Sequence, residues 1–175
     1  MLLIRLFLFV ITLFISIDLI EDYFLLRQKK IIIYNISNHV AIDLISGNNH
    51  YFLADQDLIN NPAKIKFHIE NNWHYNDLNS PVIIPLKDFI SKTIRWENLK
   101  IAFVDKNWSH TRNVNIAVVI NTPKLPNVLF SNSAIKIIQK GRSFINKEKI
   151  DNKLMKNNHT IYDVFNRGSY IYELK

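Results

Sequence analysis

The chain has 175 residues, of which 48% are hydrophobic and 21% are charged; this balance indicates a globular domain with an added apolar segment and excludes a disordered protein. It has no cysteine, which excludes disulfides, Cys-ligated metal sites and thiol nucleophiles. It also has no glycine-rich phosphate-loop pattern. The net charge of +7 favours nucleic acid or anionic lipid as a partner, although a general abundance of lysine explains the same total.

Residues 1–26 are predicted to be a membrane anchor. From Leu6 to Ile17 only two hydroxyl residues interrupt a run of apolar side chains, and flanking apolar residues extend it to the roughly 20 residues that a membrane-spanning helix needs. Arg5 would suit the start of a signal peptide, but no small residues follow at a cleavage position. A buried amphipathic helix is the other alternative. We expect an uncleaved anchor that crosses the bilayer once.

The charges beside this anchor leave its orientation open. Arg5 lies on one side, and Arg27, Lys29 and Lys30 lie on the other, so the positive-inside rule taken literally places the remaining chain in the cytoplasm. Two acidic residues lie closer to the apolar run than these cations do, and they weaken the rule. The side of the membrane on which the soluble part lies is therefore not predicted.

The soluble part, residues 27–175, is predicted to be one domain that opens with a three-stranded meander. The strand candidates are Lys30–Ile36, Val40–Ile45 and His50–Ala54. The second and third are separated by Ser-Gly-Asn-Asn at 46–49, and Gly and Asn tolerate the positive φ of a tight hairpin. Residues 30–54 should therefore form consecutive neighbouring strands.

The remaining elements alternate between helical and strand patterns. A helix with an imperfect pattern is expected over 55–73, and one helix or two over 133–157. Strands are expected at 82–86, 99–105, 114–120 and 127–130, and a closing hairpin is expected from 160–164 and 170–174. Strands early and late with helices between them predict an α/β sandwich.

One stretch of this pattern resembles a known family. Ile31–Asp57 reads IIIYNISNHVAIDLISGNNHYFLADQD, and it resembles the opening meander of the metallo-β-lactamase-like domain at the C-terminus of the ComEC competence-channel family, most of all its Bacteroidetes-type members. Val114–Lys124, Val128–Lys136 and Ile161–Leu174 are similar to later parts of that domain, in the same order. The apolar segment is similar to the last membrane helix of the channel.

The resemblance implies a fold, a place and partners. It implies one membrane helix followed by a reduced metallo-β-lactamase-like α/β sandwich, in a bacterial inner membrane. The implied partners are the lipid bilayer, single-stranded DNA and a separate multi-spanning channel subunit. Two features depart from the family: Ser131 stands where an aspartate is typical, with a short link at Leu125–Pro126, and the channel core is absent. The chain looks like a detached or truncated terminal piece of such a channel.

The resemblance also frames the question of catalysis. Hydrolases on this fold hold one or two metals with an H-x-H-x-D-H motif. The six histidines of this chain, at 39, 50, 68, 74, 110 and 159, include no two that are two or three residues apart. We therefore expect a degenerate, noncatalytic domain with no catalytic residue, no metal site and no cofactor.

The best remaining group of polar residues is His39 with Asp55 and Asp57, on loops expected at the edge of the lost metal site. The favoured reading is structural: His39 caps a turn, Asp55 ends a strand, and Asp57 is the N-cap of the next helix. Asp43 lies within an apolar strand, and alternation turns it away from Ile42 and Leu44, towards the expected solvent face.

Nucleic-acid contact is predicted for a basic segment and for aromatic residues. Lys136, Lys140 and Lys147 would fall on one face of the expected helix, with Arg142 beside them. Trp96, Trp108 and Tyr75 lie in polar stretches and are candidates for stacking on bases. A solvated amphipathic helix without a ligand is the alternative.

Two functions follow. The first is a noncatalytic, membrane-tethered terminal fragment of a DNA-uptake channel that contacts single-stranded DNA. The second is a membrane-anchored interaction or structural domain without a nucleic-acid role.

Overall fold

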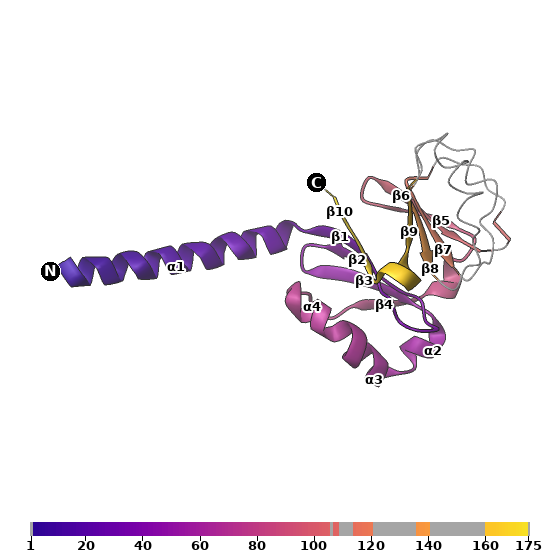
Figure 1. The fold of residues 1–175 in the computed structure, drawn as a ribbon, viewed down its shortest axis with the longest axis horizontal. Coiled ribbons are helices and arrows are strands. Elements are labelled where there is room, and N and C mark those ends of the chain that lie inside the picture. Colours follow the sequence, from indigo (N-terminus) through magenta and orange to yellow (C-terminus); the bar gives the residue numbers. More distant parts are fainter. Residues whose placement is uncertain (1, 106, 109–113, 121–135, 141–159, 175) are drawn as a thin grey trace.

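The computed structural model describes residues 2–105, 107, 108, 114–120, 136–140 and 160–174. A long N-terminal helix leads into a domain of two β-sheets with a layer of short helices on one of them (Figure 1). The α/β prediction, with an apolar helix before a sheet-containing domain, is confirmed.

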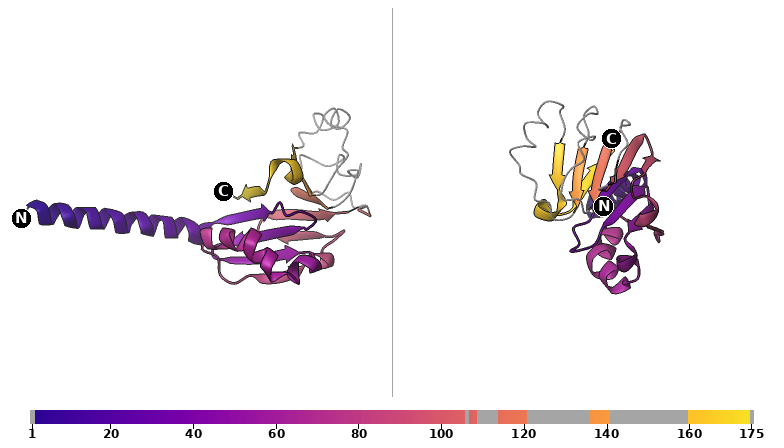
Figure 2. Two further views of the ribbon diagram at one scale, coloured as in Figure 1. Left: turned by 60° about the horizontal axis from the view of Figure 1, so that its bottom comes forward. Right: turned by 90° about the vertical axis from the view of Figure 1, so that its right-hand side faces the viewer.

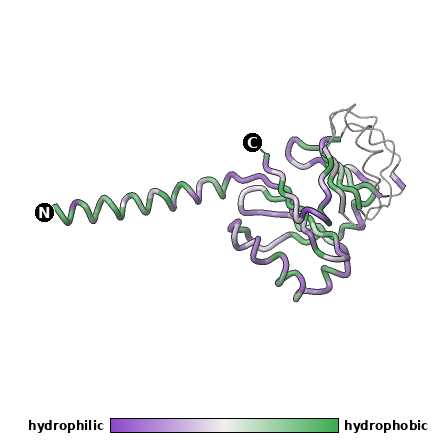
Figure 3. The backbone as a smooth tube through the Cα atoms, in the orientation of Figure 1, coloured by the Kyte–Doolittle hydropathy of each residue, from purple (hydrophilic) through white to green (hydrophobic). Residues whose placement is uncertain are grey.

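The N-terminal helix, α1 (Leu2–Arg27), projects from the domain, and none of its residues is buried (Figure 3). In the part of the chain that the structure describes, it is the one helix long and apolar enough to cross a membrane. Its 26 residues span about 39 Å, against a hydrocarbon core of about 30 Å. Thr12 and Ser16 donate their hydroxyl protons to the carbonyls of Leu8 and Thr12, both at 2.8 Å. Their polar atoms are thereby satisfied within the helix, as an apolar environment requires.

The first sheet has the strand order β10-β1-β2-β3-β4. Its members are β1 (Lys29–Ile33), β2 (Ala41–Ser46), β3 (Asn49–Ala54), β4 (Val82–Pro85) and β10 (Tyr170–Glu173). The predicted meander is confirmed, because β1, β2 and β3 pair antiparallel in chain order. Gly47 turns the β2–β3 hairpin with a φ of +59°.

The second sheet has the order β5-β6-β7-β8-β9, and its last four strands run parallel. Its members are β5 (Thr93–Trp96), β6 (Leu99–Val104), β7 (Ile116–Ile120), β8 (Lys136–Lys140) and β9 (Thr160–Asp163). The predicted helix over 133–157 is wrong at 136–140, where β8 pairs between β7 and β9. The rest of that stretch and the predicted strand at 127–130 lie outside the described residues.

The predicted closing hairpin is also wrong. β9 belongs to the second sheet and β10 to the first, where β10 pairs antiparallel with β1. The chain passes between them through the single turn α6 (Val164–Arg167), capped by Asp163, and through Gly168 with a φ of +88°. A pattern that suggested one local hairpin is therefore the crossing that ties the two sheets together.

Two apolar layers hold the first sheet. One lies between the sheets and joins Ile31, Ile33 and Ile42 to residues such as Ile101, Phe103 and Val118. The other lies on the outer face, where Ile32 and Phe52 pack against a helical layer (Figure 2). That layer consists of α2 (Gln56–Ile59), α3 (Pro62–Ile65), the π-helix η1 (Lys66–Glu70) and α4 (Asn71–Tyr75). The 3-10 turn η2 (Leu86–Asp88) follows β4.

Candidate functional site

The strands of the domain have one set of ends near α1 and another set far from α1, and we call the second set the far edge. β1 starts directly after α1 and runs away from it, and β3 and β4 run in the same direction. Glu97, just before β6, contacts Lys29 and Ser46, which puts the starts of the parallel strands β6–β9 at the α1 end. Parallel strands of both sheets therefore end at the far edge, where α/β proteins place their ligands.

His39 and Asp55 come together at this far edge, as the sequence grouping predicted. His39 precedes β2, Asp55 follows β3, and the His39 Nδ1 lies 3.0 Å from the Asp55 Oδ1. Lys64 of α3 lies on the other side of the ring, with its Nζ 2.9 Å from His39 Nε2. A lysine ammonium can only donate, so Nε2 accepts and Nδ1 carries the proton that is donated to Asp55.

Asp55 also binds backbone groups. Its Oδ2 accepts from the Val40 N–H at 2.7 Å and its Oδ1 from the Leu58 N–H at 2.9 Å. Partial burial raises the pKa of Asp55, but the hydrogen bonds from His39 and from these two amides outweigh it and hold that pKa below its ordinary value. Asp55 is therefore the N-cap of α2. The prediction that Asp57 caps this helix is wrong, because Asp57 is an exposed residue of its first turn.

Two other carboxylates that follow strands at this edge accept hydrogen bonds from nearby protein groups. Asp105, after β6, accepts from the Ser91 hydroxyl and from the Asn107 amide N–H. Asp163, at the end of β9, accepts from the Phe165 N–H at 3.0 Å and caps α6. These contacts stabilise turns, and they use the oxygens that a ligand would need.

The metal site of the hydrolases to which the sequence resemblance pointed does not fit these residues. Among the described residues, no three or more His, Cys, Asp or Glu side chains group closely enough to hold an ion. At His39 both ring nitrogens have partners, and the Lys64 ammonium lies where a metal would bind Nε2. A fixed positive charge at that position repels a divalent cation.

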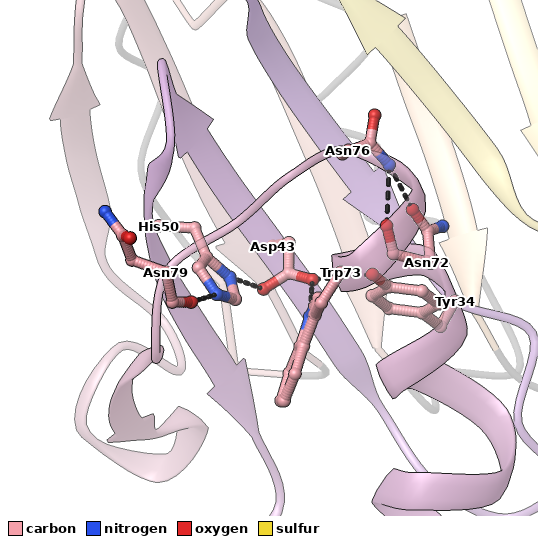
Figure 4. A network of polar contacts seen from close by, with 7 residues as sticks. All are labelled: Tyr34, Asp43, His50, Asn72, Trp73, Asn76 and Asn79. Carbon is pink, nitrogen blue, oxygen red and sulfur yellow. Dashed lines mark hydrogen bonds and ion pairs between the residues drawn. The ribbon is translucent and has the colours of Figure 1, made fainter. Parts of the chain in front are cut away.

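A second histidine–aspartate pair lies buried between the first sheet and its helical layer (Figure 4). Asp43 is fully buried, so the prediction of a solvent-facing side chain is wrong; the opposite face of β2 is covered by α4. Its Oδ2 accepts from the Tyr34 hydroxyl at 2.6 Å and from Trp73 Nε1 at 2.8 Å. Its Oδ1 lies 2.8 Å from His50 Nδ1.

The hydrogen bonds of this buried cluster show where two of its protons lie. His50 Nε2 lies 3.1 Å from the Asn79 carbonyl oxygen, which can only accept, so Nε2 carries a proton. One further proton lies between His50 Nδ1 and Asp43 Oδ1. Burial raises the pKa of Tyr34 far above its ordinary value, and the negative charge of Asp43 adds to this rise. Tyr34 thus stays a neutral donor.

Sequence reasoning missed this cluster, although a signal was present. With the hairpin turn at 46–49, Asp43 faces Phe52, which makes His50 its diagonal neighbour on the same face of the sheet. Two ionisable residues at diagonal positions in a mainly apolar meander indicate a buried pair. Tyr34 and Trp73 come from more distant segments and leave no such local signal.

Of the predicted nucleic-acid residues, the two tryptophans are buried. Trp96 is only 8% exposed and packs between the sheets, and Trp108 is 5% exposed. The expectation that they are available for stacking is wrong in this conformation. Lys136 and Lys140 lie in β8, not on a helical face. Arg142 and Lys147 lie outside the described residues, so their contact with DNA stays a prediction.

The last feature is the junction between α1 and the domain. The Gln28 side chain donates to the Asn76 carbonyl at 2.8 Å and to the Gly47 carbonyl at 3.2 Å, and the Gly47 N–H donates to the Gln28 carbonyl at 2.8 Å. A Cβ on Gly47 would lie 2.9 Å from the Leu26 carbonyl oxygen, so only glycine fits this approach. The helix thus continues into the domain without a free linker.

Comparison with known proteins agrees with the resemblance seen in the sequence. The model of the family described as the ComEC C-terminal domain matches residues 31–174, which is most of the chain and all of the described β-strands except the start of β1. Neither the search of curated proteins nor the search of solved structures found a match. With its apolar helix and the two-sheet domain that this family match covers, the chain belongs to the ComEC C-terminal domain family of competence and DNA-uptake channel proteins.

Proposed function

We propose that this chain is a noncatalytic, membrane-tethered domain of a DNA-uptake channel and that it contacts single-stranded DNA. The observation that carries the proposal is the family match over 31–174 directly after a helix suited to span a membrane. The proposed location is a bacterial inner membrane, which α1 crosses once. The proposed partner is a multi-spanning channel subunit, as expected for a domain of this channel family.

Tethering is supported by the character of α1 and by the junction. All side chains of α1 are at least partly exposed, and most of its large apolar residues are more than half exposed. The hydrogen bonds of Gln28 to the β2–β3 turn and to Asn76 restrict the movement of the helix relative to the domain. The proposed tether therefore holds the domain at one distance and one orientation from the bilayer.

A membrane-extraction experiment tests the tether. The full chain should stay with the membrane pellet in alkaline carbonate and enter the soluble fraction only with detergent. Because the chain has no cysteine, a Lys87→Cys variant offers a single labelling site on the exposed η2 turn. A membrane-impermeant maleimide added from one side then reports which side holds the domain. Release of the full chain by carbonate would refute the tether.

The noncatalytic part of the proposal is supported by how the acidic and histidine side chains are used. Asp43 and His50 bind each other inside the protein, and His39 binds Asp55 and Lys64 at the far edge. We expect no hydrolysis of single- or double-stranded DNA by the full chain when Mg²⁺, Mn²⁺ or Zn²⁺ is added. Hydrolysis that His39→Ala abolishes would overturn this part.

The second function, an anchored structural or interaction domain without a DNA role, is separated by DNA binding itself. A full chain that is folded and inserted in lipid, yet binds no oligonucleotide at low salt, would favour the second function. The tether would stand in that case.

A further inference from the structure

Two aromatic side chains on the helical layer are among the most exposed apolar groups of the domain. Phe67 of η1 is 77% exposed, and Tyr75 at the end of α4 is 84% exposed. Ile65, Ile69 and Trp73, offset by two positions from these rings, face the sheet and form the buried side of the same helical run. Phe67 and Tyr75 therefore lie on the outer side, and nothing in the described part of the chain covers them.

The rest of this surface is basic. Lys64, Lys66, His68 and His74 are exposed between and beside the rings, and Glu70 is the one acidic residue from 62 to 75. The aliphatic residues of the run are turned inwards, so the surface offers ring faces and cations with no apolar patch around them. We call the exposed residues Lys64, Lys66, Phe67, His68, His74 and Tyr75 the aromatic face.

The composition of the aromatic face matches single-stranded nucleic acid. The bases of a single strand stack on aromatic rings whatever the nucleotide sequence is, and lysines contact the phosphates along its backbone. Phe67 and Tyr75 are eight residues apart, roughly 12 Å along a helix, which leaves room for further nucleotides between two stacked bases. Phe67 lies in the π-helix η1. π-helices are rare overall, and those that occur are often found at functional sites.

The position of the aromatic face fits a strand that arrives from the membrane. Tyr75 directly precedes Asn76, whose carbonyl binds Gln28 at the end of α1. The run then leads away from α1, through Phe67 to α2 and the far edge of the domain (Figure 1). A strand leaving a channel beside α1 would meet Tyr75 first and Phe67 next.

We infer that the aromatic face is the surface through which this domain contacts single-stranded DNA, by stacking on Phe67 and Tyr75 and by phosphate contact with Lys66. This inference rests on the proposed function and names its contact site. It replaces the buried Trp96 and Trp108 as stacking residues.

Fluorescence anisotropy tests the inference, with the full chain in nanodiscs of zwitterionic lipid and a labelled oligothymidylate as the probe. Phe67→Ala and Tyr75→Ala should each weaken binding by about 5-fold or more, because each removes one stacked base. Phe67→Trp and Tyr75→Phe keep a ring and should bind as the parent does. Lys66→Gln should reduce the slope of log K against log salt by about 0.7.

Tyr51→Ala is the matched control. Tyr51 is 49% exposed on the opposite side of the first sheet, so its loss should leave binding unchanged. Circular dichroism must show that each variant is folded. Tight binding by the parent that both alanine variants retain would overturn the inference and leave the DNA role standing elsewhere on the chain. No binding by the folded parent would refute the inference and the direct DNA role together, and would reassign the aromatic face to a protein partner.

Discussion

The two histidine–aspartate pairs of this domain use the same side chains in opposite ways. In the buried pair, His50 contacts Asp43 through Nδ1 and donates to the Asn79 carbonyl through Nε2, and both side chains are 0% exposed. In the edge pair, His39 donates to Asp55 and accepts from Lys64, and its side chain is 10% exposed beside a 30% exposed Asp55. The buried pair joins layers of the fold, whereas the edge pair fixes one loop and one helix end.

The difference shows what decides the role of such a pair. A buried carboxyl group is tolerable only when it is well hydrogen-bonded, and Asp43 has three partners: the Tyr34 hydroxyl, the Trp73 N–H and the His50 ring. A partly exposed carboxylate such as Asp55 is bound by His39 and by two backbone amides, and water can reach the rest of it. Removal of the carboxylate should therefore cost far more at Asp43 than at Asp55.

The largest expected effect is that of Asp43→Ala. It leaves the buried His50 ring, the Tyr34 hydroxyl and the Trp73 N–H without their shared partner, which should lower the free energy of unfolding by about 3–5 kcal/mol. Urea unfolding of the full chain in detergent measures it. Asp57→Ala, an exposed aspartate in the first turn of α2, is the control and should change stability by less than about 0.5 kcal/mol. A loss below about 1 kcal/mol for Asp43→Ala would show that the buried pair does not hold the sheet and the helical layer together.

Trp73→Phe should have the next largest effect. It keeps a ring against His50 and Phe52, whose centroids lie 5.1 and 5.4 Å from that of Trp73, and removes one donor to Asp43. A charge-assisted hydrogen bond contributes about 1.5–3 kcal/mol, so the free energy of unfolding should fall by that order.

A double-mutant cycle sharpens this prediction. Tyr34→Phe removes the other donor to the same oxygen, so the two substitutions should couple by about 0.5 kcal/mol or more. Strict additivity would contradict a shared acceptor.

At the edge pair, Asp55→Ala should cost about 1–2 kcal/mol, because α2 loses its N-cap and the Val40 N–H loses an acceptor. Asp55→Asn keeps a capping oxygen and should retain most of the stability at neutral pH. An alanine variant as stable as the asparagine variant would mean that the cap contributes nothing.

The charge of Asp55 adds a pH signature. Its pKa is lower in the folded than in the unfolded state, so its contribution is present above the unfolded pKa and is lost as the pH falls through the folded pKa. The stability difference between the parent and Asp55→Asn should be constant from neutral pH down to about pH 4 and shrink below it. A difference that grows on acidification would reverse the assigned direction.

The last prediction involves no change in stability and concerns which ring nitrogens of His39 and His50 carry protons. Nitrogen-15 spectra of histidine-labelled protein at neutral pH should show a protonated Nε2 for His50 and a protonated Nδ1 with a bare Nε2 for His39. Lys64→Gln should alter the His39 signals and leave those of His50 unchanged. A bare Nε2 on His50 would contradict its hydrogen bond to the Asn79 carbonyl.

The sequence alone predicts the local parts of this fold well. The meander follows from β-branched strands and a Gly-Asn turn, and the apolar helix follows from one continuous run. The family resemblance, too, came from the meander, and the family match bears it out.

Long-range arrangement accounts for the failures. Asp43 was predicted to face solvent because no residue near it in sequence indicates that α4 covers it. Trp96 and Trp108 were predicted to be exposed because their sequence neighbours are polar, whereas their burial comes from packing across strands. β9 and β10 lie close in sequence, yet Gly168 and α6 send them to different sheets. In β8, lysines at both ends of a short apolar core fit a helix and a strand equally well.

The hydrogen bonds around Gln28 make α1 a lever arm. Because Gly47 and Asn76 are held to the residue that follows α1, a change in the tilt of the helix should move the domain with it. With α1 in the membrane, as proposed, a rearrangement of helices beside it would displace the domain in the aqueous phase. A larger residue at position 47 should break this mechanical link while leaving both of its ends folded.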